Sequence, residues 1–388
     1  MHKSYLPMID ASWILLSLVY MVILIGSLIQ ISRHMKVGFS AKAITILFLY
    51  YYLFFLFTTF IPLLADLPDT KLFAGIITNN TFGRSSLGVQ LFYIISYPIR
   101  VLSFFKVELF VLFQIFIFIL SLMILWKSWQ IVLEKNNQDK YSEVNLFLVL
   151  SAVYPSFLLY IPVPLREFFA LLGFSLVTYG IVNKFYNNKG FILIIIGSAI
   201  LIFVRPQLII IAIIFLALSQ KNKWLKYISI FGSIFLVPFA FSYLFSWKFT
   251  PEFFAYLRNV HFDKYIGIVG YGPAEWKTYF DILEDLPLLF LQFILAPLPI
   301  LHNQNPTDFF VAFLDGLFSI GLYIGTIYAG IRVSKIYLFI FLISAVIFSI
   351  WEFHIIAATR HRMVIVAILL PVASYGMLKM YQDIRAKL

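Results

Sequence analysis

Long apolar runs recur along the whole chain, and several of them approach the length that crosses a lipid bilayer. A helix rises about 1.5 Å per residue and bilayer hydrocarbon is about 30 Å thick, so about 20 apolar residues suffice for one crossing. Of the 388 residues, 62% are hydrophobic and 12% are charged. A soluble domain carries about 25% charged residues, which this chain lacks. The chain is therefore expected to be an integral membrane protein.

Aromatic residues, 19% of the chain, are spread through the apolar runs and do not alternate with polar residues as in a transmembrane barrel. We predict an all-α, polytopic protein, a single transmembrane domain over residues 1–388 with about eleven spans. The first span shows no cleavable-signal pattern and is expected to be retained. The spans are Trp13–Ile31, Ile44–Leu64, Val107–Trp126, Val144–Tyr160, Phe168–Val182, Phe191–Val204, Leu208–Leu218, Tyr227–Phe245, Phe309–Ile331, Ile336–Ile350 and Met363–Met380.

Lysine and arginine are concentrated in alternate loops. These loops contain Arg33, Lys36 and Lys42; Lys127, Lys135 and Lys140; Lys184 and Lys189; Lys221, Lys223 and Lys226; Arg332 and Lys335; and Lys379, Arg385 and Lys387. The positive-inside rule places such loops in the cytoplasm. It predicts an N-terminus outside and a cytoplasmic C-terminus. The net charge of +11 is thus explained by the basic loops that orient the protein in the membrane, and no nucleic-acid partner is expected.

Two further apolar stretches, Val89–Phe105 and Leu286–Leu301, would break this alternation if each crossed the membrane. Both contain proline, which suits juxtamembrane or re-entrant helices at the outer interface. We predict that neither crosses, so that two long outer loops cover about residues 65–106 and 246–308. A protein with about thirteen true spans is the alternative.

Arginines stand at the outer mouths of the predicted helix hairpins. These are Arg166, Arg205, Arg360 and Arg362. A guanidinium group binds phosphate oxygens through two parallel donors and stays charged at physiological pH, so the four are candidate ligands of one phosphate-bearing donor. The alternatives are arginines that extend to lipid headgroups and, for Arg166, a structural salt bridge with Glu167.

Candidate bases lie on the same face. Asp69 follows the second span and could take a proton from a sugar hydroxyl, although an aspartate at that place also suits a helix start. His361 and His261 are further candidates, against the alternative that each is merely hydrogen-bonded. Candidate substrate contacts are Asp66, Glu167, Arg258, Glu352 and His354. Cysteine, nucleotide-binding loops and a zinc-binding His-Glu-x-x-His motif are absent from the sequence, so neither a cofactor nor a metal is expected.

Short motifs follow one another in a recognisable order. They are Pro155-Ser156, Pro164-Leu-Arg166-Glu167-Phe168, Arg205-Pro206, Phe293–Pro299 and Thr359-Arg-His-Arg362, after Asp69 and Phe73 in the first outer loop. This order resembles O-antigen and exopolysaccharide polymerases of the Wzy and EpsG-like types and the GT-C superfamily of membrane glycosyltransferases. The tyrosine expected after the first-loop aspartate is Phe73 here, and an Asp-x-Asp motif is absent, which puts metal dependence in doubt.

The resemblance implies glycan transfer from an undecaprenyl (di)phosphate-linked donor to a lipid-linked acceptor at the outer leaflet. The chain is short for a GT-C enzyme, which favours a repeat-unit polymerase, with a chain-length regulator as a candidate partner. A GT-C transferase with a polyprenyl-phosphate monosaccharide donor is one alternative. Another is a flippase or transporter of lipid-linked sugar, with Asp315 inside an apolar helix as a coupling residue. An acyltransferase would need a cytoplasmic base, and none stands out.

Overall fold

The structure is a computed structural model. It describes residues 12–60, 68–79, 87–139, 143–218, 220, 222–224, 226–229, 231–232, 242, 248–264, 273–296, 306–352 and 355–387. Every regular element within these residues is an α-helix, as predicted. The chain divides into two compact units, Met1–Ile209 and Ile210–Leu388, where one domain was predicted from the sequence. The two units are described separately.

Among the described residues, six helices are long and apolar enough to cross a membrane. They are Ser12–Met35, Ala41–Thr59, Val107–Lys135, Glu167–Asn187, Ala312–Arg332 and Ala358–Arg385. Each overlaps a predicted span, which supports a membrane protein, and the count of about eleven spans stays a prediction. Shorter apolar helices cover Phe191–Val204, Leu208–Ala217 and Lys335–Ile350, on three further predicted spans. The predicted span Tyr227–Phe245 lies largely outside the described residues.

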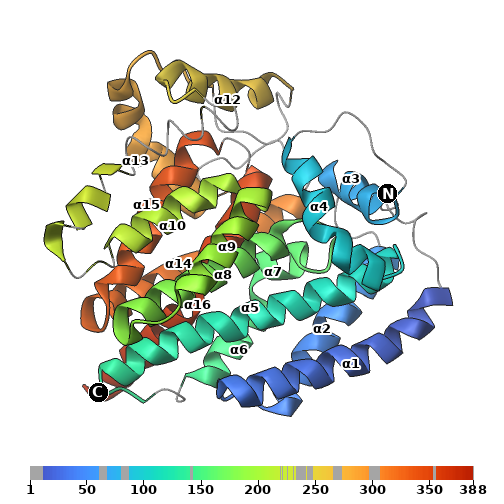
Figure 1. The fold of residues 1–388 in the computed structure, drawn as a ribbon. Coiled ribbons are helices and arrows are strands. Elements are labelled where there is room, and N and C mark those ends of the chain that lie inside the picture. Colours follow the sequence, from blue (N-terminus) through green and yellow to red (C-terminus); the bar gives the residue numbers. More distant parts are fainter. Residues whose placement is uncertain are drawn as a thin grey trace. The chain divides into compact units, whose positions relative to one another are not determined.

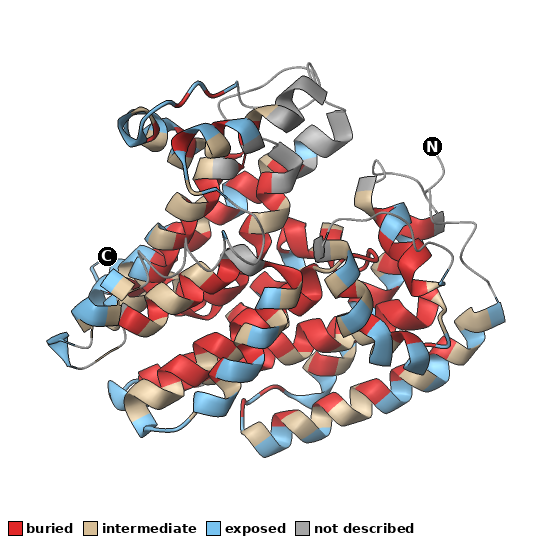
Figure 2. Ribbon diagram, turned by 45° about the horizontal axis from the view of Figure 1, so that its top comes forward, coloured by how far each residue is buried: buried red, intermediate tan, exposed pale blue. Residues whose placement is uncertain are grey.

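In the first unit the long helix α5 is the centre of the helix packing. The helices are α1 (Ser12–Met35), α2 (Ala41–Phe60), α3 (Pro68–Ile77), α4 (Leu87–Leu102), α5 (Val107–Lys135), α6 (Val144–Val153), α7 (Pro155–Tyr160), α8 (Glu167–Asn187) and α9 (Phe191–Val204). Helix α5 lies between α1 and α8, and α9 packs on α8 (Figure 1). The apolar stretch of α5 is 83% buried and that of α1 is 22% buried. Helix α1 is exposed along much of its length (Figure 2), as expected of a helix that faces lipid.

One predicted span is interrupted. The sequence predicts a continuous helix over Val144–Tyr160, whereas α6 ends at Val153 and α7 begins at Pro155. Proline has no backbone N–H to donate, and it forces the preceding residue out of the helical conformation. Tyr154 accordingly has extended angles, φ −65° and ψ 119°. The prediction of one uninterrupted helix here is wrong for this reason.

The second unit contains the C-terminal helices. They are α12 (Pro251–Lys264), α13 (Tyr279–Leu295), α14 (Pro306–Arg332), α15 (Lys335–Trp351) and α16 (Ile355–Arg385); α10 (Pro206–Leu218) leads into this unit. Helix α14 packs along α16, and α13 packs on α15. The apolar stretch of α16 is 78% buried, which makes it the central helix of this unit.

Both stretches predicted to lie at the outer interface form helices. Helix α4 has 16 residues and α13 has 17, and neither is among the six helices long and apolar enough to cross. Helix α13 begins with a capping box in which Thr278 and Asp281 bond reciprocally through side chain and backbone. The backbone N–H groups of Thr278 and Lys277 donate to the Asp281 carboxylate and lower its pKa. The position of both helices relative to the membrane stays a prediction.

Helices α14 and α16 approach closely at glycine. A Cβ added at Gly325 would lie 2.6 Å from the carbonyl oxygen of Ala373, whereas one added at Gly321, one turn earlier, would meet nothing within 4 Å. Close backbone contact through small residues stabilises helix pairs in membranes. Gly321 and Gly325 of α14 therefore differ in whether a neighbouring helix packs against them.

Gly325→Ala should destabilise the protein by about 1–3 kcal/mol, because the new methyl group forces α14 away from α16. Thermal unfolding in mild detergent measures the change. Gly321→Ala is the matched control and should keep or raise the melting temperature, since alanine favours a helix. Equal destabilisation by the two substitutions would show that the close contact at Gly325 does not limit packing.

Candidate functional site

In the first unit, the structure brings Arg166 to the helix that carries Asp69. Helix α3 begins at Pro68, and Asp69 lies half-buried in its first turn. The guanidinium carbon of Arg166 lies 6.0 Å from the centre of the Phe73 ring. Residues four apart share one face of a helix, so Asp69 and Phe73 lie on the α3 face that Arg166 contacts. The structure thus brings Arg166 to Phe73, one helical turn after Asp69, from a part of the sequence about a hundred positions away.

The Phe73 side chain beside Arg166 is buried and packed. Its side chain is 2% exposed, and its ring meets the Phe92 ring edge-on with 4.9 Å between the ring centres. A guanidinium group over an aromatic face is attracted by the electrons of the ring and held in orientation. Phe73, at the place where the resemblance expects a tyrosine, thus presents an aromatic ring near Arg166.

Arg100, from α4, fixes α3 in place. Its guanidinium group is fully buried and donates to the Ile76 carbonyl oxygen at 3.0 Å and to Asn79 Oδ1 at 2.7 Å, both at the end of α3. It also lies over the Tyr93 ring, 3.8 Å from the ring centre. Sequence reasoning placed Arg100 at the end of a juxtamembrane stretch and missed this role. A buried arginine that bonds two carbonyl-type oxygens makes α3 a rigid support for Asp69.

The loop before Arg166 is held from α5. The Gln114 side-chain amide, buried in that helix, donates to the carbonyl oxygens of Ile161 and Val163, each at 2.6 Å. Prolines in this loop remove backbone donors, so the free carbonyl groups need side-chain partners. Gln114 therefore fixes the path of the chain that leads to Arg166, a function that nothing in the linear sequence indicated.

Glu167 and Arg205 form a buried ion pair. Glu167 is the first residue of α8, where a carboxylate suits the positive end of the helix, and Arg205 lies between α9 and α10. The helix break predicted at Arg205-Pro206 is confirmed. Because Glu167 balances the charge of Arg205, Arg205 is a less favourable anion ligand than the sequence suggested. Arg205 is thus an ion-pair partner of Glu167, and the structural salt bridge weighed for Arg166 stays a prediction.

In the second unit, His361 and Glu352 form an imidazole–carboxylate pair. Nδ1 of His361, in α16, contacts Oε1 of Glu352, which follows α15 directly. Arg258, from α12, donates to the Glu352 carbonyl oxygen at 3.0 Å and to Gln292 Oε1 at 3.4 Å. A carboxylate on one ring nitrogen fixes the orientation of the imidazole ring. The pair can therefore accept or relay a proton.

Arg362 is held entirely by the protein. It donates to the Asp315 carboxylate through Nε and one Nη, and to the carbonyl oxygens of Phe293, Ile294 and Ala296. The side chains of Arg362 and Asp315 are both fully buried. The five N–H donors of this guanidinium are thus used, which leaves none for a phosphate in this conformation. Its geometry indicates a structural role.

The remaining predicted site residues are placed as follows. Arg360 is half-buried in α16. Asp66 and His354 lie outside the described residues, as does the side chain of His261 in α12. Arg166 and Arg205 belong to the first unit and Arg360 and Arg362 to the second, so their convergence on one anionic group stays a prediction.

Within the part of the chain that the structure describes, groups of three or more His, Asp or Glu side chains that could hold a metal ion are absent. Comparison with known proteins finds no matching family model, curated protein or solved structure.

Proposed function

We propose that the chain is a membrane glycosyltransferase at the outer leaflet of a bacterial cytoplasmic membrane. It transfers glycan from an undecaprenyl (di)phosphate-linked donor to a lipid-linked acceptor, as an O-antigen or polysaccharide repeat-unit polymerase does. The observation that carries the proposal is the meeting of Arg166 with the Asp69 face of α3 across the Phe73 ring. Such a transfer requires a cation for the leaving phosphate and a carboxylate base, and Arg166 and α3 supply one of each.

In the proposed reaction, Arg166 binds the donor's phosphate groups. The bond between the anomeric carbon and the phosphate oxygen breaks, and the guanidinium group stabilises the charge that develops on the leaving phosphate. The acceptor hydroxyl forms the new bond to the anomeric carbon and loses its proton to Asp69. His361, oriented by Glu352, is a second candidate base in the other unit.

The proposed topology has about eleven spans, with the N-terminus outside and the C-terminus in the cytoplasm. It places the start of α8 and the end of α9 at the outer face. Arg166, Glu167 and Arg205 lie at these helix ends, which supports an outer-leaflet site. Helices α4 and α13 are the proposed interfacial helices of the two outer loops, because spans at both places would break the alternation of basic loops.

A transferase with a polyprenyl-phosphate monosaccharide donor would use the same groups and remains the second candidate. Transport of lipid-linked sugar is less favoured, because Asp315, its proposed coupling residue, is held in a buried ion pair with Arg362.

Purified protein in vesicles, supplied with lipid-linked repeat units, should produce a ladder of glycans that differ by one repeat unit. Gel electrophoresis of the labelled product separates the alternatives. A monosaccharide transferase would extend the acceptor once, and a transporter would move labelled lipid across the bilayer without changing its length. Unchanged product under conditions in which the protein remains folded would contradict the proposed activity.

A further inference from the structure

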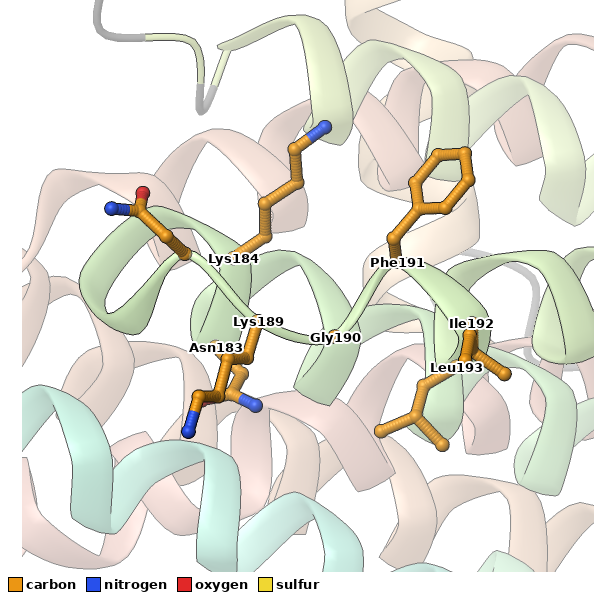
Figure 3. Close-up of a pocket in the computed structure, with 8 residues that line it drawn as sticks. Asn183, Lys184, Lys189, Gly190, Phe191, Ile192 and Leu193 are labelled. Carbon is orange, nitrogen blue, oxygen red and sulfur yellow. The ribbon is translucent and has the colours of Figure 1, made fainter.

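The connection between α8 and α9 forms a basic pocket at the predicted cytoplasmic face, away from the candidate site. Its volume is about 520 Å³. Lys184 and Lys189 both line the pocket near the turn at Gly190, and Figure 3 shows their side chains extending to opposite sides of that turn. The lining residues are Asn183, Lys184, Asn188, Lys189, Gly190, Phe191, Ile192 and Leu193. They provide two cations and two amide groups and no carboxylate, which suits an anionic ligand.

The shape of the connection is fixed by glycine. Gly190 has φ +110°, a conformation that other residues rarely adopt, and its backbone lies directly against that of Gly180. Asn188, with φ 56°, ends α8 and donates its backbone N–H to the Lys184 carbonyl oxygen at 3.0 Å. The two lysines are therefore carried on a rigid turn, which positions them before any ligand binds.

The wall of the pocket continues into an apolar stripe on α9. Phe191 and Ile192 are 62% and 70% exposed, and the Lys184 ammonium lies 5.5 Å from the centre of the Phe191 ring. The exposed stripe continues through Ile195, Ile196 and Ile202. Phe191, Ile192, Ile195 and Ile196 are linked by intervals of three and four residues, and Ile202 lies two turns after Ile195, so all five lie on one side of the helix. A ligand in the pocket thus has an adjoining apolar surface about as long as an acyl chain.

We propose that this pocket binds the headgroup of an anionic phospholipid, whose acyl chain lies along the exposed stripe of α9. The lysines attract the phosphate group, and the asparagine amides can bond its oxygens or the glycerol hydroxyls. The positive charge of the lysines favours an anionic headgroup over a neutral one. The apolar stripe favours a lipid over a soluble anion, because only a lipid has an acyl chain to lie along it. Basic pockets between helices at the cytoplasmic side are suited to such headgroups.

The test measures binding of phosphatidylglycerol to the whole protein in mild detergent by native mass spectrometry, with phosphatidylcholine and inorganic phosphate as comparison probes. Wild-type protein should retain phosphatidylglycerol in preference to phosphatidylcholine. Lys184→Gln with Lys189→Gln should weaken phosphatidylglycerol binding about thirtyfold, because each lysine near an anionic headgroup contributes about a fivefold gain.

The matched control is Lys36→Gln with Lys42→Gln. These lysines are exposed, belong to the same unit and the same predicted face, and do not line the pocket. The control should bind phosphatidylglycerol as the wild type does. If both double variants lost phosphatidylglycerol binding equally, the effect would come from the total positive charge of this face and not from the pocket. That result would overturn the proposal. Binding of inorganic phosphate that displaces the lipid at equal concentration would overturn it as well, since the occupant would then be a soluble anion.

Discussion

Replacing Arg166 by alanine should lower the rate of glycan elongation about 100- to 1000-fold. Removal of one preorganised donor to a developing negative charge has an effect of this size in other enzymes. Arg166→Lys should recover part of the rate, because lysine keeps the charge but cannot bond two phosphate oxygens in one plane or lie flat on Phe73. The rate of ladder formation in vesicles measures both variants.

The control for Arg166 is an arginine that the proposal leaves out. Arg332 ends α14 and pairs with Asp383 at an exposed position, where an ion pair contributes little to stability. Arg332→Ala should elongate glycan at the wild-type rate. Normal elongation by Arg166→Ala, in protein shown to be inserted and folded, would remove Arg166 from the reaction and with it the observation on which the proposed function rests.

Phe73→Leu separates positioning from binding at the same site. Leucine fills much of the volume of the phenyl ring but has no ring electrons to attract a guanidinium group. If Phe73 acts through Arg166, Phe73→Leu should lower the rate of glycan elongation in the wild-type protein. The same substitution should change that rate little in protein that already carries Arg166→Ala. Independent losses would indicate that Phe73 contributes to packing and not to the orientation of Arg166.

The helices could be predicted from the sequence because apolar length is a local property. The helix break at Arg205-Pro206 could be predicted for the same reason, since proline acts on its immediate neighbours. The break at Pro155 depends on the same local rule, which a long apolar run obscured. The presence of a helix and its approximate bounds can thus be predicted where neighbouring residues determine them.

The partners of the charged groups could not be predicted in the same way. Arg205 bonds Glu167 across 38 positions, and Arg362 bonds Asp315 across 47. Such pairs depend on which helix faces meet, and a single sequence carries no record of that. Gln114 and Arg100 were missed because a buried polar residue in an apolar run does not reveal the carbonyl groups that it will bond. Sequence reasoning therefore identified charged positions better than it identified their roles.

The buried pair of Asp315 and Arg362 gives the second large expected effect. Asp315→Leu should destabilise the protein by about 3–5 kcal/mol, because it leaves the Arg362 cation buried without its counter-charge. Thermal unfolding in detergent should show a fall in melting temperature on the order of 10 °C. Asp315→Leu with Arg362→Met should be more stable than Arg362→Met alone, since the double variant buries no unpaired carboxylate.

A control pair lies on the same two helices. Arg332 of α14 and Asp383 of α16 also form an ion pair, but their side chains are 54% and 39% exposed. Arg332→Met and Asp383→Leu should leave the melting temperature nearly unchanged, because water solvates either charge once its partner is removed. Equal destabilisation at the buried and exposed pairs would contradict the argument from burial.

Asp315→Asn then distinguishes a structural pair from a coupling site. Asparagine keeps an oxygen that can accept from Arg362 but carries no charge and takes up no proton. If the pair is structural, this variant should lose stability and, once folded, elongate glycan at the wild-type rate. Wild-type stability with complete loss of function would instead mean that Asp315 acts by exchanging a proton. That result would favour transport of lipid-linked sugar over its transfer, because only transport assigns chemistry to a carboxylate in the middle of this helix pair.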